Sequence, residues 1–356
     1  MKQGQSLSSI AGELERQLDT RKDFLAPTNL ISMSVEDEKP VINGLNGAGR
    51  GITEHAHGQF SDFTGIPRKY YDRVRASDPN LLATNVNHWL SQDSKKRMIR
   101  TLDGNVRAFL SDRYRPLDNY DLAETALPIL QEKGCKVESA ALTDTRLYIK
   151  ATLQSLQVEV ANSPLQGDVV QAGIVISNSE VGAGSVRIEP MIYRLVCQNG
   201  MIAADSSIRK YHVGRGHDVD DIRELLTSEA RMADDKAFWL KVRDLIRAAF
   251  DRELFCTIIR RMEDAAARRI VTDNLTKVVE IASEKLRLSE GNKQSVLRHL
   301  VEGGDLSQYG MVNAITRTSQ DVDDYDEATE LERAGGKLLE LDFVDWDKIT
   351  RAAKAA

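Results

Sequence analysis

The fold is decided by the segment VVQAGIVISNSEVGAGSVRIEPMIYRLVC, which spans residues 169–197. Two runs rich in β-branched and apolar residues, 169–177 and 186–197, flank a glycine-rich turn at Glu180–Ser185. Runs of this kind on either side of a turn predict two long antiparallel strands. Proline cannot donate to the ladder of hydrogen bonds, so Pro190 predicts that the second strand lies at a sheet edge or contains a bulge.

Two shorter hairpins precede this pair of strands. Residues 97–102 and 106–110 flank the turn Asp103–Asn105, and residues 137–142 and 146–153 flank a second polar turn. Glycine tolerates the positive φ that a tight turn requires, so the glycine of the first turn favours a hairpin there. Successive hairpins predict an antiparallel sheet.

Helical periodicity covers much of the remaining chain. Apolar residues at helical spacing predict helices at 6–24 and 118–132, and an almost continuous series of helices from Asp218 onward. The glycines and proline of 36–51 predict a loop. The expected fold class is therefore α+β, an antiparallel sheet decorated with helices and followed by an all-α C-terminal region. We expect three units: an N-terminal helix and glycine-rich loop (1–50), an α+β core domain (51–215) and a helical domain (216–356), with a linker near 211–217.

Composition limits the class of protein. Of the 356 residues 41% are hydrophobic and 29% are charged, which provides a core and excludes wholesale disorder. No apolar run approaches the ~20 residues that cross a bilayer, and the first residues lack the apolar stretch of a signal peptide. Three widely spaced cysteines argue against a disulfide framework or a zinc site. We expect a cytoplasmic protein with no membrane partner.

No motif for catalysis, metal binding or cofactor binding is evident. The glycines of 44–51 lack the lysine and hydroxyl pair of a phosphate-binding loop. His55 and His57 are two residues apart and would point to different sides of a helix. The acidic groups at 218–221 and 321–324 precede helices, where negative charge complements the helix dipole. We therefore expect no catalytic residue, no metal and no cofactor.

A basic segment is the most informative feature for function. The whole chain has a net charge of -6, yet eleven basic and only five acidic residues lie between Arg68 and Arg115, interleaved with Tyr70, Trp89 and other aromatics. Cations that follow phosphates and aromatic rings that stack on bases are typical of single-stranded DNA binding. The alternative is a solvated surface that pairs with acidic helices. The candidate nucleic-acid-binding residues, including strand-borne cations further on, are Lys95, Lys96, Arg97, Arg100, Arg107, Arg113, Tyr114, Arg115, Lys150, Arg187 and Arg194.

Several stretches of the predicted strands and of the basic segment resemble a known protein family. The stretches Gly173–Gly182, Arg187–Pro190 and Tyr193–Gly200 resemble the phage/plasmid-like family of prokaryotic proteins that carries domain of unknown function 932. The resemblance extends to Gly65–Pro67 with Tyr70–Tyr71, to Leu110–Asn119, and to Asn313–Ala314 with Tyr325–Asp326. It implies a role in mobile-element biology and supplies no catalytic residues.

A weaker, fold-level similarity is to single-strand annealing proteins of the Rad52 type, which form rings that hold single-stranded DNA in a basic groove. Together these features predict a mobile-element protein that binds or anneals single-stranded DNA in recombination or replication without catalysis. It would act as a homo-oligomer, with a host or phage recombination protein as a further candidate partner. The alternative is a protein-interaction module that modulates a host factor, presenting the acidic segment Asp321–Glu332 to its partner.

Overall fold

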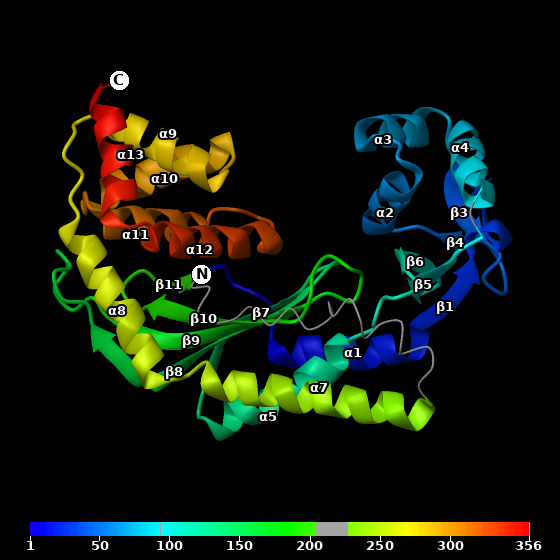
Figure 1. Cartoon of the computed structure of the whole chain (residues 1–356), viewed down its shortest axis with the longest axis horizontal. Coiled ribbons are helices and arrows are strands. Elements are labelled where there is room, and N and C mark those ends of the chain that lie inside the picture. The colour runs from blue at the N-terminus through cyan, green and yellow to red at the C-terminus, as the bar shows by residue number, and fades with distance from the viewer. Residues whose placement is uncertain (93, 204–226, 356) are drawn as a thin grey trace.

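The computed structural model describes residues 1–92, 94–203 and 227–355. Its centre is a five-stranded antiparallel sheet in the spatial order β11-β10-β9-β8-β7 (Figure 1). Each strand pairs with its neighbour in sequence, so the sheet is a simple meander. Its strands are β7 (Lys136–Leu142), β8 (Leu147–Glu159), β9 (Val169–Asn178), β10 (Arg187–Arg194) and β11 (Asn199–Ile202).

Apolar side chains cover one face of this sheet. Ile149, Ile174 and Ile176 point to this face, because alternate residues of a strand share a side. They pack in one core with α1 (Leu7–Thr20), α5 (Asn119–Glu132) and α7 (Ser228–Ala248). The helix α8 (Arg252–Ala267) continues this layer over the far end of the sheet, where it packs on Val170 and Ala172.

The opposite face of the sheet is more polar and is covered by α12 (Tyr325–Leu339). Lys150 Nζ donates to Glu332 Oε2 at 2.6 Å, and both side chains are completely buried. Beside them, Arg333 of α12 pairs with Glu189 of β10 at 2.6 Å. Losing one partner of such a buried pair would leave an isolated charge, so these pairs hold α12 in one position on the sheet. The other helices of this C-terminal block are α9 (Leu275–Leu286), α10 (Glu290–Gly303), α11 (Gln308–Thr318) and α13 (Phe343–Ala355).

A second core forms an N-terminal lobe beyond one end of the large sheet. Phe60, Ile99 and Val106 lie at its centre. The lobe contains two small sheets, in the orders β1-β5-β6 and β2-β3-β4, and three helices. Its elements are β1 (Lys22–Pro27), η1 (Thr28–Leu30), β2 (Ser32–Glu36), β3 (Lys39–Asn43), β4 (Arg50–Gly51), α2 (Glu54–Thr64), α3 (Arg68–Ser77), α4 (Pro79–Gln92), β5 (Lys96–Leu102) and β6 (Asn105–Ser111).

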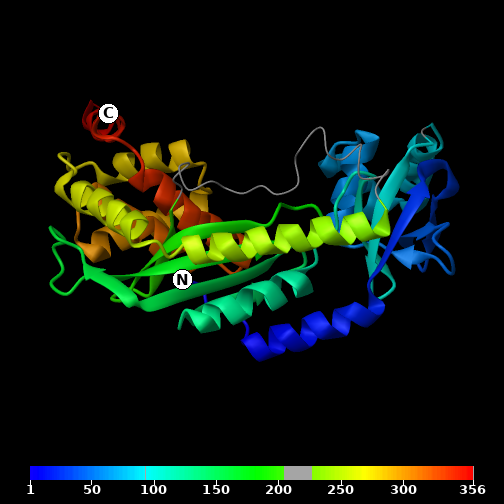
Figure 2. The same ribbon diagram turned by 60° about the horizontal axis from the view of Figure 1, so that its bottom comes forward.

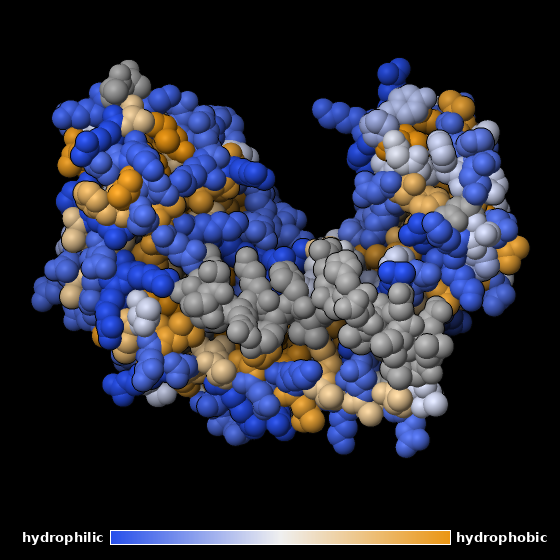
Figure 3. Space-filling view, in the orientation of Figure 1, coloured by the Kyte–Doolittle hydropathy of each residue, from blue (hydrophilic) through white to orange (hydrophobic). Residues whose placement is uncertain are grey.

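The N-terminal lobe and the C-terminal block stand apart at opposite ends of the large sheet (Figures 1 and 2). Figure 3 shows the hollow between them as a notch with mainly hydrophilic walls. The helices α2 and α3 border the notch on the side of the lobe, and one end of α12 borders it on the side of the block (Figure 1). Thr145 of the β7–β8 turn donates to Asp326 of α12 at 2.9 Å, which places this turn at the notch.

The α+β fold class is confirmed, with the sheets formed within residues 22–202 and helices in the described residues that follow the last strand. The three predicted hairpins form, but the last run ends at Arg194 and is followed by a separate strand, β11. The expected loop at 36–51 instead contains β3 and β4, and β1 follows the first helix. No helix in the described ranges is both long enough and apolar enough to span a membrane.

The core residues divide the chain differently from the expected units. The core of the N-terminal lobe takes residues from Ile31 to Phe109 and so crosses the expected boundary at residue 50. The helices α1 and α7, from opposite parts of the chain, share the core of the large sheet. The expected linker near 211–217 lies outside the described residues.

Candidate functional site at the notch between lobe and block

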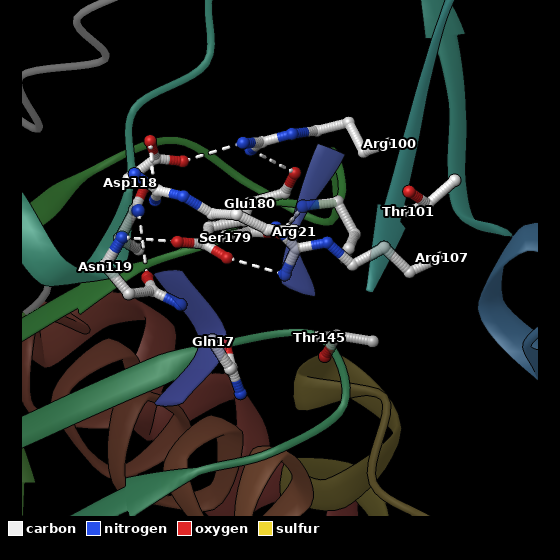
Figure 4. A network of polar contacts seen from close by, with 12 residues as sticks. Gln17, Arg21, Arg100, Thr101, Arg107, Asp118, Asn119, Thr145, Ser179 and Glu180 are labelled. Carbon is white, nitrogen blue, oxygen red and sulfur yellow. Dashed lines mark hydrogen bonds and ion pairs between the residues drawn. The ribbon is translucent and has the colours of Figure 1, made fainter. Parts of the chain in front are cut away.

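The segment Asn178–Gly182, at the start of the β9–β10 loop, joins the large sheet to the N-terminal lobe. Glu180 accepts hydrogen bonds from the backbone N of Asn119 and from Arg107 Nη1, both at 2.6 Å (Figure 4). The carbonyl of Val181 accepts from Gln59 Nε2 at 2.7 Å. We call this segment the hub, because it connects α2, β6 and the start of α5.

A second set of charges strengthens the same junction. Arg100 is 1% exposed and donates to Asp23 at 2.9 Å. It also donates to Asp118 at 2.7 Å and to the carbonyl of Glu180 at 3.0 Å (Figure 4). Arg21 pairs with the other oxygen of Asp118 at 2.7 Å. Two family-like stretches, Leu110–Asn119 and Gly173–Gly182, therefore meet in one polar network.

The structure pairs five of the predicted DNA-binding cations with carboxylates. Their side chains are buried or mostly buried, so their charges are neutralised within the protein and do not form an exposed basic groove. Each contact joins segments far apart in sequence. The pairs are Arg100 with Asp23 and Asp118, Arg107 with Glu180 at 2.6 Å, Arg115 with Asp235 at 2.5 Å, Lys150 with Glu332 at 2.6 Å, and Arg194 with Asp168 at 2.5 Å.

The remaining predicted residues occupy several different places. The guanidinium of Arg97 lies over the ring of Phe63 at 5.0 Å, inside the N-terminal lobe. Tyr114 donates to the carbonyl of Ser179 at 3.1 Å and so belongs to the junction around the hub. Lys95, Lys96 and Arg113 are exposed. The structure thus does not bring the eleven residues to one surface.

Arg187 is a predicted residue with no carboxylate within ion-pair distance in the described ranges, and its nearest opposite charges are those of Glu189 and Glu330. It begins β10, and its Nε is buried with no hydrogen-bond acceptor. Arg146, in the neighbouring β7–β8 turn, has the same property at Nη1. Burial and the positive charges of Arg333 and Arg146 lower the pKa of Arg187, against the opposing effect of Glu189 and Glu330. We call Arg146 and Arg187 the floor pair.

The β9–β10 loop holds Arg146 in place. Arg146 Nη2 donates to the carbonyl of Ala183. A Cβ atom at Gly184 would lie 2.7 Å from Arg146 Nη1, so the absence of a side chain there lets the guanidinium approach the loop closely. The glycine-rich turn between β9 and β10 therefore packs against Arg146 of the preceding hairpin, β7–β8.

The two walls of the notch differ in charge. On α3 of the N-terminal lobe, Lys69 and Arg73 are exposed one helical turn apart, no acidic partner for either exists in the described ranges, and Tyr70 is 50% exposed. The start of α12 instead exposes Asp323, Asp324 and Glu327. Phosphates would therefore be attracted to α3 and the floor pair and repelled by the start of α12.

A cavity of about 550 Å³ lies beneath the hub, between α1, the β5–β6 turn and the β7–β8 turn. Gln17, Asn119, Thr145 and Glu180 line it (Figure 4). Its charged groups largely pair with one another, as Glu180 does with Arg107. Nowhere in the described ranges do three or more histidine, cysteine or carboxylate side chains gather in a way that could hold a metal ion.

Sequence reasoning missed Arg146 as a notch residue, because a single cation after a turn carries no distinctive pattern. Lys69, Tyr70 and Arg73 lie inside the basic segment that the sequence did identify. Lys69, Tyr70 and Arg73 lie on a helix, whereas Arg100 and Arg107 lie on strands. Charged residues with polar neighbours on a surface helix form its solvent face, and this signal could have separated the two groups.

Comparison with known proteins gives one match. No curated protein and no solved structure matches the chain. The profile of the domain of unknown function DUF932 matches residues 107–328, which include the hub, the floor pair and most of the C-terminal block. This match covers more than half of the 356-residue chain, and the protein therefore belongs to the DUF932 family.

Proposed function

We propose that this protein binds single-stranded nucleic acid in the notch and that it does so without catalysing a reaction. The observation that carries the proposal is the floor pair. Arg146 and Arg187 each hold a buried guanidinium nitrogen without an acceptor. Arg146 follows Thr145, whose hydroxyl donates to Asp326 at the start of α12. Buried donors of this kind are normally satisfied, and a phosphate oxygen would satisfy them with charge-assisted hydrogen bonds.

The wall formed by α3 supports the same proposal. Lys69 and Arg73 provide two cations for successive phosphates, and the exposed ring of Tyr70 provides a surface for base stacking. Base stacking on an aromatic ring and phosphate contacts to cations bind a strand without reading its sequence. The acidic start of α12 would keep the strand on the side of α3.

The phage/plasmid-like resemblance supports a role in recombination or replication of mobile elements. Binding or annealing of strands is the activity that the floor pair and the wall formed by α3 support.

Fluorescence anisotropy with a labelled single-stranded oligonucleotide over a range of salt concentrations tests the proposal. The wild-type protein should bind at micromolar concentration or tighter, and more weakly as salt increases. Replacing two phosphate-contacting cations of a single-strand site reduces the slope of log K against log salt by about 1.4. We expect this reduction for Arg146→Ala/Arg187→Ala.

A matched control removes the same charge elsewhere. Arg252 and Arg260 are exposed on α8, far from the notch in Figure 1, and the variant Arg252→Ala/Arg260→Ala should retain the wild-type slope. If thermal unfolding shows that the floor-pair variant is unfolded, Lys69→Ala/Arg73→Ala on the surface of α3 serves instead. No binding at low salt, or an equal slope in notch and control variants, would contradict the proposal.

A second function is supported by a different observation. The start of α12 exposes Asp323, Asp324 and Glu327 at the notch, which would suit a basic protein segment. Capture from nuclease-treated lysate distinguishes this interaction module from a nucleic-acid binder. A stoichiometric protein lost in Asp323→Asn/Glu327→Gln, together with no oligonucleotide binding, would favour the module.

A further inference from the structure

Arg107 of β6 uses only part of its guanidinium. Its Nη1 donates to Glu180 at 2.6 Å, whereas Nε and Nη2 are buried and nothing in the described ranges accepts a hydrogen bond from them. The residue is 8% exposed and lines the cavity of about 550 Å³ beneath the hub. Buried donors are normally hydrogen-bonded, so these two nitrogens indicate a partner that enters through the cavity.

The two nitrogens form the edge of a guanidinium that holds a carboxylate by two parallel hydrogen bonds. The chain uses this edge elsewhere. Arg194 holds the two oxygens of Asp168 through Nε at 2.5 Å and Nη2 at 2.7 Å. Arg333 holds Glu189 through the same two nitrogens, at 3.1 and 2.6 Å. Arg107 presents this edge without a carboxylate on it, and a planar carboxylate is the group that fits it.

The rest of the cavity suits a small polar molecule with one negative charge. Its volume lies within the range of small-molecule sites, and amide and hydroxyl groups of Gln17, Asn119 and Thr145 line it (Figure 4). The lining contains one more acidic than basic side chain, so a dianion such as hydrogen phosphate would be repelled. A single carboxylate carries half that charge and matches the free edge of Arg107.

We infer that the cavity beneath the hub binds a small molecule through a carboxylate group, which Nε and Nη2 of Arg107 hold. Glu180 keeps Nη1, so the guanidinium lies between two carboxylates. Arg100 already has this arrangement, between Asp23 and Asp118. The inference is independent of the proposed nucleic-acid binding, because Arg107 is not among the residues proposed to contact the strand.

NMR of the full chain labelled with ¹⁵N, freed of nucleic acid and with acetate as the probe, tests the inference. The Arg107 Nε–H signal is the one that Arg107→Lys lacks. In the wild-type protein this signal should shift downfield as acetate is added at constant ionic strength, and the shift should saturate at millimolar acetate. The Nε–H signals of exposed arginines such as Arg252 should not follow it.

Variants separate the free edge of Arg107 from its ion pair. Arg107→Lys keeps a cation for Glu180 but has no second edge, so acetate affinity should fall by about tenfold or more. Saturation transfer to the acetate methyl group measures this affinity. The matched control Arg252→Lys changes an exposed arginine of α8 in the same way and should retain the wild-type affinity.

An Arg107 signal that does not move would overturn the inference, and so would equal shifts at exposed arginines. Inorganic phosphate that displaces acetate at a lower concentration would overturn the assignment to a carboxylate. If Arg107→Lys fails to fold, Arg107→Met/Glu180→Gln replaces it. This double variant leaves neither member of the buried pair charged, and its glutamine keeps an acceptor for the backbone N of Asn119. It should also lose acetate binding, and wild-type affinity there would contradict the role of Arg107.

Discussion

A buried histidine shows how a single residue of the N-terminal lobe responds to its surroundings. His57 is 4% exposed, and its Nδ1 lies 3.0 Å from the hydroxyl of Tyr71. Burial, together with the positive charge of Arg75, lowers the pKa of His57 to about 4. An unfolded histidine has a pKa of about 6.5. The folded protein therefore binds fewer protons than the unfolded chain between these two pH values.

This difference makes the stability of the protein depend on pH. The contribution of His57 is complete above pH 6.5 and is lost as the pH falls toward 4. Between pH 7 and pH 5 the wild-type protein should lose about 2 kcal/mol of unfolding free energy that His57→Asn, which does not titrate, retains. Urea unfolding of both proteins at the two pH values measures this difference, and equal losses would show that His57 is not the source.

At the scale of elements, the start of α12 combines a structural and an electrostatic role. Asp324 is the N-cap, and its side chain accepts from the backbone N of Glu327 at 2.7 Å. Asparagine caps as well as aspartate does, whereas alanine in place of aspartate costs about 1 kcal/mol. Asp324→Ala should therefore lower the unfolding free energy by about that amount, and Asp324→Asn should leave it nearly unchanged. Denaturant midpoints of the two variants decide the matter, since a similar loss in both would point to charge instead of capping.

The predictable elements are those whose pattern is local. The hairpins around residues 103–105 and 143–145 form as expected, because each turn and its flanking strands are contiguous. Pro190 shows where local reasoning failed: β10 lies between β9 and β11 and is not an edge strand. Its carbonyl accepts from Ala203 N, just past the end of β11. The N–H and C=O of a residue in an antiparallel pair point to the same side. The N–H that Pro190 lacks would therefore have faced the end of β11.

At the scale of the whole molecule, polar contacts through the hub join the N-terminal lobe to the sheet. Glu180 is 4% exposed and holds both Arg107 and the start of α5. Glu180→Ala would leave the buried charge of Arg107 unpaired, at a cost of about 3–5 kcal/mol. Hydrogen exchange should then become faster in β5 and β6 while β8 and β9 keep their protection. Glu253→Ala, at an exposed site on α8, is the control. A uniform increase in exchange across both sheets would contradict this role of the hub.

The candidate site was harder to predict than the fold, because charge pairing depends on long-range contacts. Lys150 and Glu332 lie on different elements just over half a chain apart, and Arg107 meets Glu180 only after the lobe docks on the sheet. Sequence composition counts these side chains as free cations. The structure separates the neutralised cations from Arg187 and its neighbour Arg146, which have no such partner in the described ranges.

The meander of β7 to β11 has a consequence for how the chain folds. Every pairing in it joins strands that follow one another directly, so each hairpin closes a short loop. The pairing of β1 with β5 instead brings Lys22 to Thr101 and must close a much longer loop. We therefore expect the strand pairings of the large sheet to form before the pairing of β1 with β5. The N-terminal lobe, although synthesised first, would complete its β1–β5 pairing on a slower timescale.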